Sequence, residues 1–175
     1  IKQEVTINGI GLHSGLSSVL TLSPLPADSG VVFCRSDMES APLINGTYNN
    51  VTVTKNCTCL GKNGAIVSTI EHLMAALYIL NIDNVLIKCS NQELPILDGS
   101  AKTFLDELKK VETVNLETNR KILKILKPVK FEDEKGNYVE LLPSDAEDLK
   151  VHFEIEFASK IVGHQIFDDV INYEI

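Results

Sequence analysis

Apolar and polar residues alternate with a period near two through the first sixty residues. The alternation is clear at 19–22 and 31–33, and stretches that contain glycine or proline interrupt it at 9–15, 24–30 and 42–46. Successive side chains of a strand point to opposite faces, while Gly and Pro mark turns. This region therefore predicts a run of short antiparallel strands.

After residue 68 the apolar spacing changes to three and four residues, which is typical of one face of an amphipathic helix. Ser68 is the expected N-cap of this helix. The apolar residues at this spacing are Ile70, Leu73, Met74, Leu77 and Leu80.

Residues 84–89 then predict a buried strand and residues 95–99 a turn. Ser100 is the expected cap of a second helix, whose apolar positions are Phe104, Leu105, Leu108 and Val111. Strands followed by two helices indicate an α+β fold, and we expect a two-layer sandwich of sheet and helices.

A polar connector at 113–119 separates this region from a second strand-like region. We place a domain boundary near residue 118, with a first domain over 1–117 and the beginning of a second over 118–175. Within the second region, 120–130 fits two structures. Lysines at every third position slightly favour a helix, whereas Pro128 and β-branched residues favour an edge strand.

The last part of the chain again predicts strands. Val151, Phe153, Ile155 and Phe157 alternate with polar residues, and a second alternation over 171–175 reaches the last residue without a turn or cap. Because a domain rarely stops inside a strand, we expect the chain to be part of a longer protein whose second domain is incomplete here.

Composition and charge exclude several classes of protein. Hydrophobic residues make up 44% and charged residues 23% of the 175 residues, as in ordinary globular domains. The net charge of −8 opposes binding to nucleic acid. The longest apolar run, 73–80, is far shorter than the roughly 20 residues of a membrane-spanning helix.

The first residues lack the apolar segment of a secretory signal. Cys34, Cys57, Cys59 and Cys89 show neither zinc-ribbon nor thioredoxin spacing. We therefore expect a cytoplasmic protein with reduced thiols.

The strongest chemical signal is Glu71 beside His72, where the first helix is expected to begin. Adjacent residues on a helix diverge by about 100°. An imidazole can bind zinc while a neighbouring carboxylate takes a proton from metal-bound water. The pair is compatible with metal-assisted hydrolysis.

A structural alternative exists for the same residues. Ser68 and Glu71 have the spacing of a capping box, in which the carboxylate only returns a hydrogen bond to the Ser68 amide. A single histidine on a helix is also more often structural than a metal ligand.

Three other features carry weaker signals. The glycine-rich stretch 9–15 lacks the Gly-Lys-Ser/Thr ending of a P-loop and predicts a hairpin, with His13 either packed or near a site. Cys57 and Cys59 are more typical of small strand residues than of a metal clip. His164 and Asp168 have helical ligand spacing, but Gly163 and the alternation around them favour turn and strand.

Four segments together resemble the zinc-dependent UDP-3-O-acyl-N-acetylglucosamine deacetylases of lipid A biosynthesis. Their order and spacing match over nearly the whole chain. The segments are 9–15 (Gly-Ile-Gly-Leu-His-Ser-Gly), 57–60 (Cys-Thr-Cys-Leu), 68–77 (Ser-Thr-Ile-Glu-His-Leu-Met-Ala-Ala-Leu) and 82–100, which includes Glu-Leu-Pro-Ile-Leu-Asp-Gly-Ser.

The resemblance implies two similar domains of sheet and helices with the active site between them, and it implies a strand at 120–130, which we adopt. It also assigns roles by position. His72 is then one zinc ligand, Glu71 is the general base, Cys57 lies near the substrate, and Glu156 and Phe157 hold the uridine of a UDP-linked acylated amino sugar.

The family's other two zinc ligands belong to a His-Lys-x-x-Asp helix, followed by a further His that acts as general acid. The chain contains neither, and 161–165 corresponds instead to an Ile-Gly-x-Gln pattern of the family. We therefore do not assign His164 and Asp168 as ligands, and we expect this chain to be inactive alone. The alternative is a non-catalytic relative that binds a nucleotide sugar or a protein partner.

Overall fold

The computed structural model describes residues 1–146 and 148–171. It divides into two compact units, Ile1–Thr118 and Asn119–Ile175. Each unit is described by itself below. Among the described residues, no helix has the length and apolar character needed to cross a membrane.

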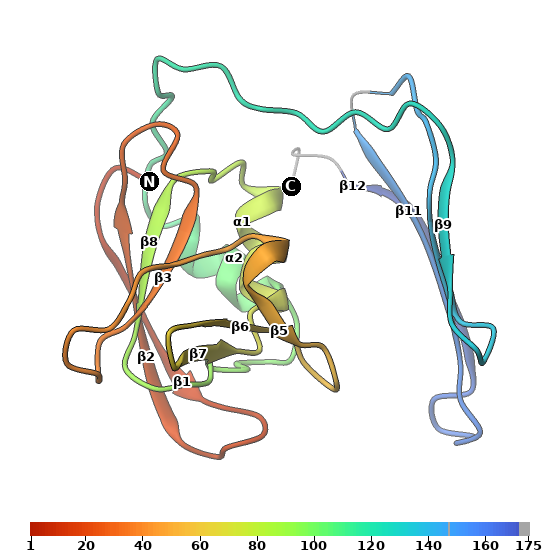
Figure 1. The fold of residues 1–175 in the computed structure, drawn as a ribbon, viewed down its shortest axis with the longest axis horizontal. Helices are drawn as coiled ribbons and strands as arrows, with labels where there is room; N and C mark the ends of the chain where they lie inside the picture. Colours follow the sequence, from red (N-terminus) through yellow and green to blue (C-terminus); the bar gives the residue numbers. More distant parts are fainter. Residues whose placement is uncertain (147, 172–175) are drawn as a thin grey trace. The chain divides into compact units, whose positions relative to one another are not determined.

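A five-stranded sheet forms one layer of the first unit (Figure 1). Its order is β1-β2-β8-β3-β4, and its strands are β1 (Val5–Ile10), β2 (Ser17–Pro24), β8 (Val85–Cys89), β3 (Val31–Arg35) and β4 (Ile44–Asn45). The predicted antiparallel pairing holds for every neighbouring pair except β3 and β8, which are parallel. Parallel neighbours need a long crossover, and here residues 36–84 provide it.

This crossover contains a second sheet and the first helix. After a 3-10 turn, η1 (Tyr48–Asn50), the antiparallel strands β5 (Val51–Val53), β6 (Cys59–Lys62) and β7 (Ala65–Ser68) follow in order. The helix α1 (Glu71–Ile79) comes directly after β7, and α2 (Lys102–Leu108) follows β8. In Figure 1 the two helices lie next to each other on one side of the five-stranded sheet.

One hydrophobic core joins the sheets and helices of this unit. The five-stranded sheet contributes Leu20, Phe33 and Ile87, α1 contributes Leu73 and Leu77, and all five are at most 1% exposed. The apolar residues that alternate along the strands and those spaced by three and four residues along α1 thus face the same interior. The predicted α+β fold is confirmed.

The predicted helix caps have different outcomes. Ser100 does cap α2 in effect, because its hydroxyl accepts a hydrogen bond from the Lys102 amide at 3.0 Å. Ser68 does not cap α1. It is the last residue of β7, and its hydroxyl donates to the Gln92 carbonyl at 3.4 Å. The pairing of β7 with β6 keeps Ser68 extended, so the helix begins three residues later.

The second unit contains two antiparallel pairs of strands. They are β9 (Val129–Glu132) with β10 (Tyr138–Leu141), and β11 (Leu149–Glu156) with β12 (His164–Ile171). The alternation predicted at 151–157 corresponds to β11. Of the alternation predicted at 171–175, only Ile171 belongs to the described residues.

Residues 120–128 form neither the predicted strand nor the alternative helix. A strand requires a hydrogen-bonded neighbour, and no described strand pairs with this segment. Ile122, Leu123 and Leu126 are more than 80% exposed, so no packing supports a helix either. The strand begins only at Val129, immediately after Pro128.

Candidate functional site

The chain turns sharply between β7 and α1. Thr69 has a positive φ of 60°, which is unusual for a β-branched residue, and its side chain is 2% exposed. Ile70 follows with helical backbone angles, and Glu71 and His72 then occupy the first turn of α1. Both side chains are half-buried. The turn at Thr69 therefore fixes where the Glu71–His72 pair is presented.

The Glu71 carboxylate contacts the segment that precedes β6. Its Oε2 atom accepts a hydrogen bond from the Thr58 amide at 3.1 Å, and the Thr58 carbonyl accepts one from the Ile70 amide at 3.4 Å. The capping-box interpretation is wrong, because Ser68 is paired in β7 and bonds to Gln92 instead. The Glu71 carboxylate therefore connects two segments, and it still has lone pairs that can accept a proton.

The His72 side chain has no hydrogen bond or ion pair with any residue of 1–146 or 148–171. Its half-buried imidazole is thus not held by a structural partner in the described part of the chain. An imidazole in such a position can act as a metal ligand.

The structure brings Cys57 and Cys59 to either side of Thr58, beside Glu71. Their Sγ atoms are 3.6 Å apart. Burial first, then the neighbouring Cys57 and the carboxylates of Glu71 and Glu93, raise the pKa of Cys59 to about 11. Cys59 therefore stays a thiol at neutral pH, whereas zinc binds the thiolate. The prediction of a small strand residue is confirmed for Cys59, the first residue of β6, and is wrong for Cys57, which lies in the bend before that strand.

The glycine-rich stretch forms the predicted hairpin between β1 and β2. Gly15 has a φ of 67°, a conformation that glycine adopts without strain. The His13 side chain is exposed, while its backbone amide points to a carboxylate described next.

Sequence reasoning missed the role of Glu93, a carboxylate that is only 4% exposed. It accepts hydrogen bonds from the amides of His13 (2.9 Å) and Ser14 (2.7 Å) and from the Thr69 hydroxyl (3.1 Å). Burial alone would raise the pKa of Glu93, but these bonds and one from the Ser14 side chain lower it to about 2. The available signal was the glycine-rich hairpin, whose exposed amides attract an anion.

Glu156 and Phe157 belong to the second unit, at the end of β11. Glu156 is opposite His164, and the Phe157 amide donates to the Gly163 carbonyl at 3.0 Å. The Phe157 ring is 57% exposed. The pair thus lies where β11 turns toward β12.

His164 and Asp168 lie in β12, as the turn-and-strand prediction required. Each pairs with a different residue of β11. His164 Nε2 is 2.6 Å from a Glu154 oxygen, and Asp168 Oδ2 is 3.1 Å from Nδ1 of His152. Within 1–146 and 148–171, no three His, Cys, Asp or Glu side chains gather as a metal site.

Comparison with known proteins agrees with this arrangement of segments. A family model described as LpxC, UDP-3-O-acyl N-acetylglycosamine deacetylase, matches residues 1–174. The UDP-3-O-acyl-N-acetylglucosamine deacetylase of Francisella tularensis is 40% identical over 175 residues, which cover 96% of this chain and 60% of that protein.

Two further relatives give similar values. The enzyme of the same name from Geotalea uraniireducens is 39% identical over 94% of this chain and 53% of its own length. The bifunctional enzyme LpxC/FabZ of Porphyromonas gingivalis is 42% identical over 94% of this chain and 36% of its own length. The chain thus spans about 60% or less of the length of these curated relatives.

Proposed function

Because the chain belongs to the LpxC family of UDP-3-O-acyl N-acetylglycosamine deacetylases, we propose that the protein containing it is a zinc-dependent deacetylase. Its substrate would be UDP-3-O-acyl-N-acetylglucosamine, in lipid A biosynthesis in the cytoplasm. The observation that carries the proposal is the Glu71–His72 pair at the start of α1, half-buried beside residues 57–59.

In this proposal Glu71 is the general base. Amide hydrolysis requires a water oxygen to bond to the acetyl carbon while the carbon–nitrogen bond breaks, which releases acetate and the amine. The Glu71 carboxylate takes the proton that the water loses, and its bond from Thr58 holds it toward the segment at 57–59. The proton for the amine comes from a group outside the described residues.

The zinc assignment fits these residues only in part. His72 offers a half-buried imidazole without another partner among the described residues, and a catalytic zinc site needs three protein ligands. We propose His72 as one of them, with the others outside the described residues. When bound, zinc would act as a Lewis acid toward water and the acetyl carbonyl.

We also propose the substrate contacts. Cys57 lies beside the Thr58–Glu71 hydrogen bond and would line the sugar end of the substrate. Glu156 and Phe157 would hold the uridine, the exposed ring of Phe157 offering a stacking surface. The chain would then consist of a first domain over 1–117 and the beginning of a second domain at 118.

The variant Glu71→Gln in the full-length protein tests the proposal. Glutamine keeps the size and can still accept from Thr58, but it takes no proton, so acetate release should fall by about 10²–10⁴-fold. The free energy of unfolding should change by no more than about 0.5 kcal/mol. Zinc content is measured in the same preparation, because loss of metal would imitate loss of the base.

Glu4→Gln is the matched control, since Glu4 is an exposed carboxylate that accepts a hydrogen bond from Ser23. It should leave acetate release unchanged. A Glu71→Gln protein with full zinc and full activity would leave Glu71 with only its bond to Thr58. A wild-type protein without deacetylase activity would instead favour the binding relative.

A further inference from the structure

Glu93 is a buried carboxylate that the proposed reaction does not use. Its hydrogen-bond donors are two backbone amides of the glycine-rich hairpin and the hydroxyl of Thr69. It therefore connects two segments that are far apart in sequence: the hairpin between β1 and β2, and the turn that begins α1.

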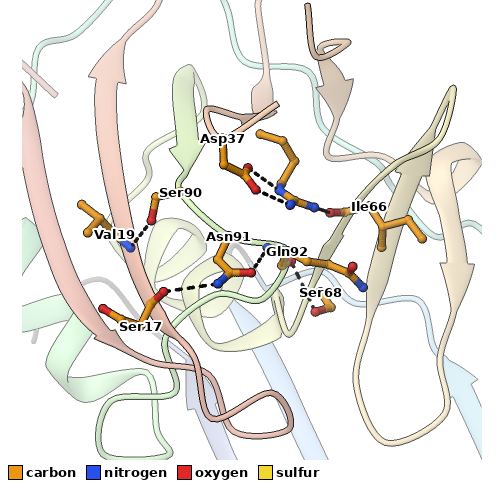
Figure 2. A network of polar contacts seen from close by, with 9 residues as sticks. Ser17, Val19, Asp37, Ile66, Ser68, Ser90, Asn91 and Gln92 are labelled. Atoms are coloured by element: carbon orange, nitrogen blue, oxygen red, sulfur yellow. Dashed lines mark hydrogen bonds and ion pairs between the residues drawn. The ribbon is translucent and has the colours of Figure 1, made fainter. Parts of the chain in front are cut away.

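The backbone around Glu93 is itself fixed on two sides. Figure 2 shows the side that faces β2, where Ser90 accepts from the Val19 amide at 2.8 Å and Asn91 donates to the Ser17 carbonyl at 3.4 Å. On the other side, residues 92–94 pair with Ser68 of β7, through bonds of 2.8 and 3.1 Å. The backbone that carries the Glu93 carboxylate is thus held in place by contacts that do not involve the carboxylate itself.

Thr69 has a conformation that needs such a partner. Its left-handed backbone is disfavoured for a β-branched residue and persists only where the surroundings hold it. The hydrogen bond from its hydroxyl to Glu93 is buried, and the next residues are Ile70, Glu71 and His72. The backbone turn that aims the Glu71–His72 pair is therefore secured through Glu93.

The hairpin is shaped to the same carboxylate. A Cβ atom added at Gly11 would lie 2.5 Å from Oε2 of Glu93, so only glycine allows the backbone to come this close. Gly11 itself is buried. The hairpin, the carboxylate and Thr69 therefore form one fitted unit.

We propose that Glu93 is a positioning residue of the active site: its carboxylate holds Thr69 in the left-handed turn and so orients Glu71 and His72. This inference rests on the proposed function, because it assigns Glu93 a role only through those two residues. Glu93 itself does not touch the substrate.

The first test is Glu93→Gln in the full-length protein. Glutamine has one oxygen where the carboxylate has two, so its amide group would face a backbone N–H of the hairpin. Misplacement by about 1 Å can cost about 10²-fold in rate, and we expect kcat to fall at least ~10-fold with KM changed less than ~3-fold. Zinc affinity, measured in competition with a chelator, should fall by about 10-fold or more.

A second pair of variants separates positioning from folding. Thr69→Val removes the hydroxyl and keeps the shape, and should lower kcat and zinc affinity in the same direction as Glu93→Gln. Thr69→Ser keeps the hydroxyl, so its kcat and zinc affinity should both stay within about 2-fold of the wild-type values. Glu4→Gln should change neither quantity. If Glu93→Gln does not fold, the valine and serine variants decide the question.

The outcomes distinguish this inference from the proposed function. Folded Glu93→Gln or Thr69→Val with wild-type kcat and zinc affinity, beside an inactive Glu71→Gln, would overturn the role of Glu93 alone. An active Glu71→Gln would overturn the role of Glu71 as general base, and a wild-type protein without deacetylase activity would overturn the proposed function, whatever the Glu93 variants do. Reduced kcat and zinc affinity in Thr69→Val, restored in Thr69→Ser, would support the positioning role.

Discussion

The two units use the same kind of strand in different surroundings. Every side chain that is buried among the described residues lies between Val5 and Leu108, in the first unit. In the second unit the large rings remain open: Phe131 is 68%, Phe153 57% and Phe167 46% exposed. Alternation of apolar and polar residues is present in both, so alternation alone does not produce a core.

The difference lies in what covers the apolar face. In the first unit α1 and α2 pack with the sheets in one core, whereas the described part of the second unit contains strands and no helix. A two-stranded pair without a covering layer is marginally stable in water. Packing therefore supports the positions of Glu71 and His72, while strand pairing and the turn after β11 support those of Glu156 and Phe157.

Truncating one phenylalanine in each unit would test this contrast most strongly. Phe33 is fully buried in β3, and Phe33→Ala should lower the free energy of unfolding by about 3–5 kcal/mol, because it removes a large side chain and leaves a cavity. Phe153→Ala should change it by no more than about 0.5 kcal/mol. Urea unfolding followed by far-UV circular dichroism measures both.

An equal loss of stability in the two variants would contradict the contrast. It would mean that the Phe153 ring is covered in solution by another part of the protein or by another copy. Thr52→Ala in the first unit serves as a check on the method, since Thr52 is exposed and should also change little.

Acid should act differently on the two units. The pKa of Glu93 is about 2 in the folded protein and near 4.5 for an ordinary glutamate, so its bonds stabilise the fold above pH 4.5 and lose this effect as the pH falls toward 2. The shift corresponds to about 3 kcal/mol. The difference in stability between wild type and Glu93→Gln should therefore shrink steadily from pH 6 to pH 2.

In the second unit, the histidine bonds lower the pKa of Glu154 and Asp168 too, but both groups are exposed and water screens them. Glu154→Gln should leave the acid profile unchanged. Parallel acid profiles for wild type and Glu93→Gln would show that the buried carboxylate does not differ in pKa between folded and unfolded protein.

The sequence predicted the features that depend on local pattern. The hairpin at 9–15, the strand at 84–89, both helices and the Glu71–His72 pair were all found from spacing, turn residues and family resemblance. Features decided by distant partners were not found. The parallel pairing of β3 with β8 and the burial of Glu93 depend on segments 24 or more residues away. The extended state of Ser68 depends on its pairing with Cys59 of β6 and on its bond to Gln92.

In the segment 120–128 a local pattern predicted a regular element that does not form. Its lysine spacing and its resemblance each predicted a regular element, yet a helix or strand forms only where a neighbour packs or pairs with it. Among the described residues no strand pairs with this segment, and Ile122, Leu123 and Leu126 are exposed. The roles of Cys57, Glu156 and Phe157 remain predictions, and those of Glu156 and Phe157, in the second unit, have the least structural support.

The smallest expected effect concerns ligand binding in the second unit. If Phe157 stacks on the uracil ring, Phe157→Ala in the full-length protein should weaken UDP affinity by about 10-fold, since stacking of a base on an aromatic ring contributes about 1–3 kcal/mol. Isothermal titration with UDP measures the change. Phe153→Ala is the matched control, because both rings are 57% exposed and belong to the same stretch of chain. Equal UDP affinity in wild type and Phe157→Ala would remove Phe157 and its neighbour Glu156 from the proposed uridine site.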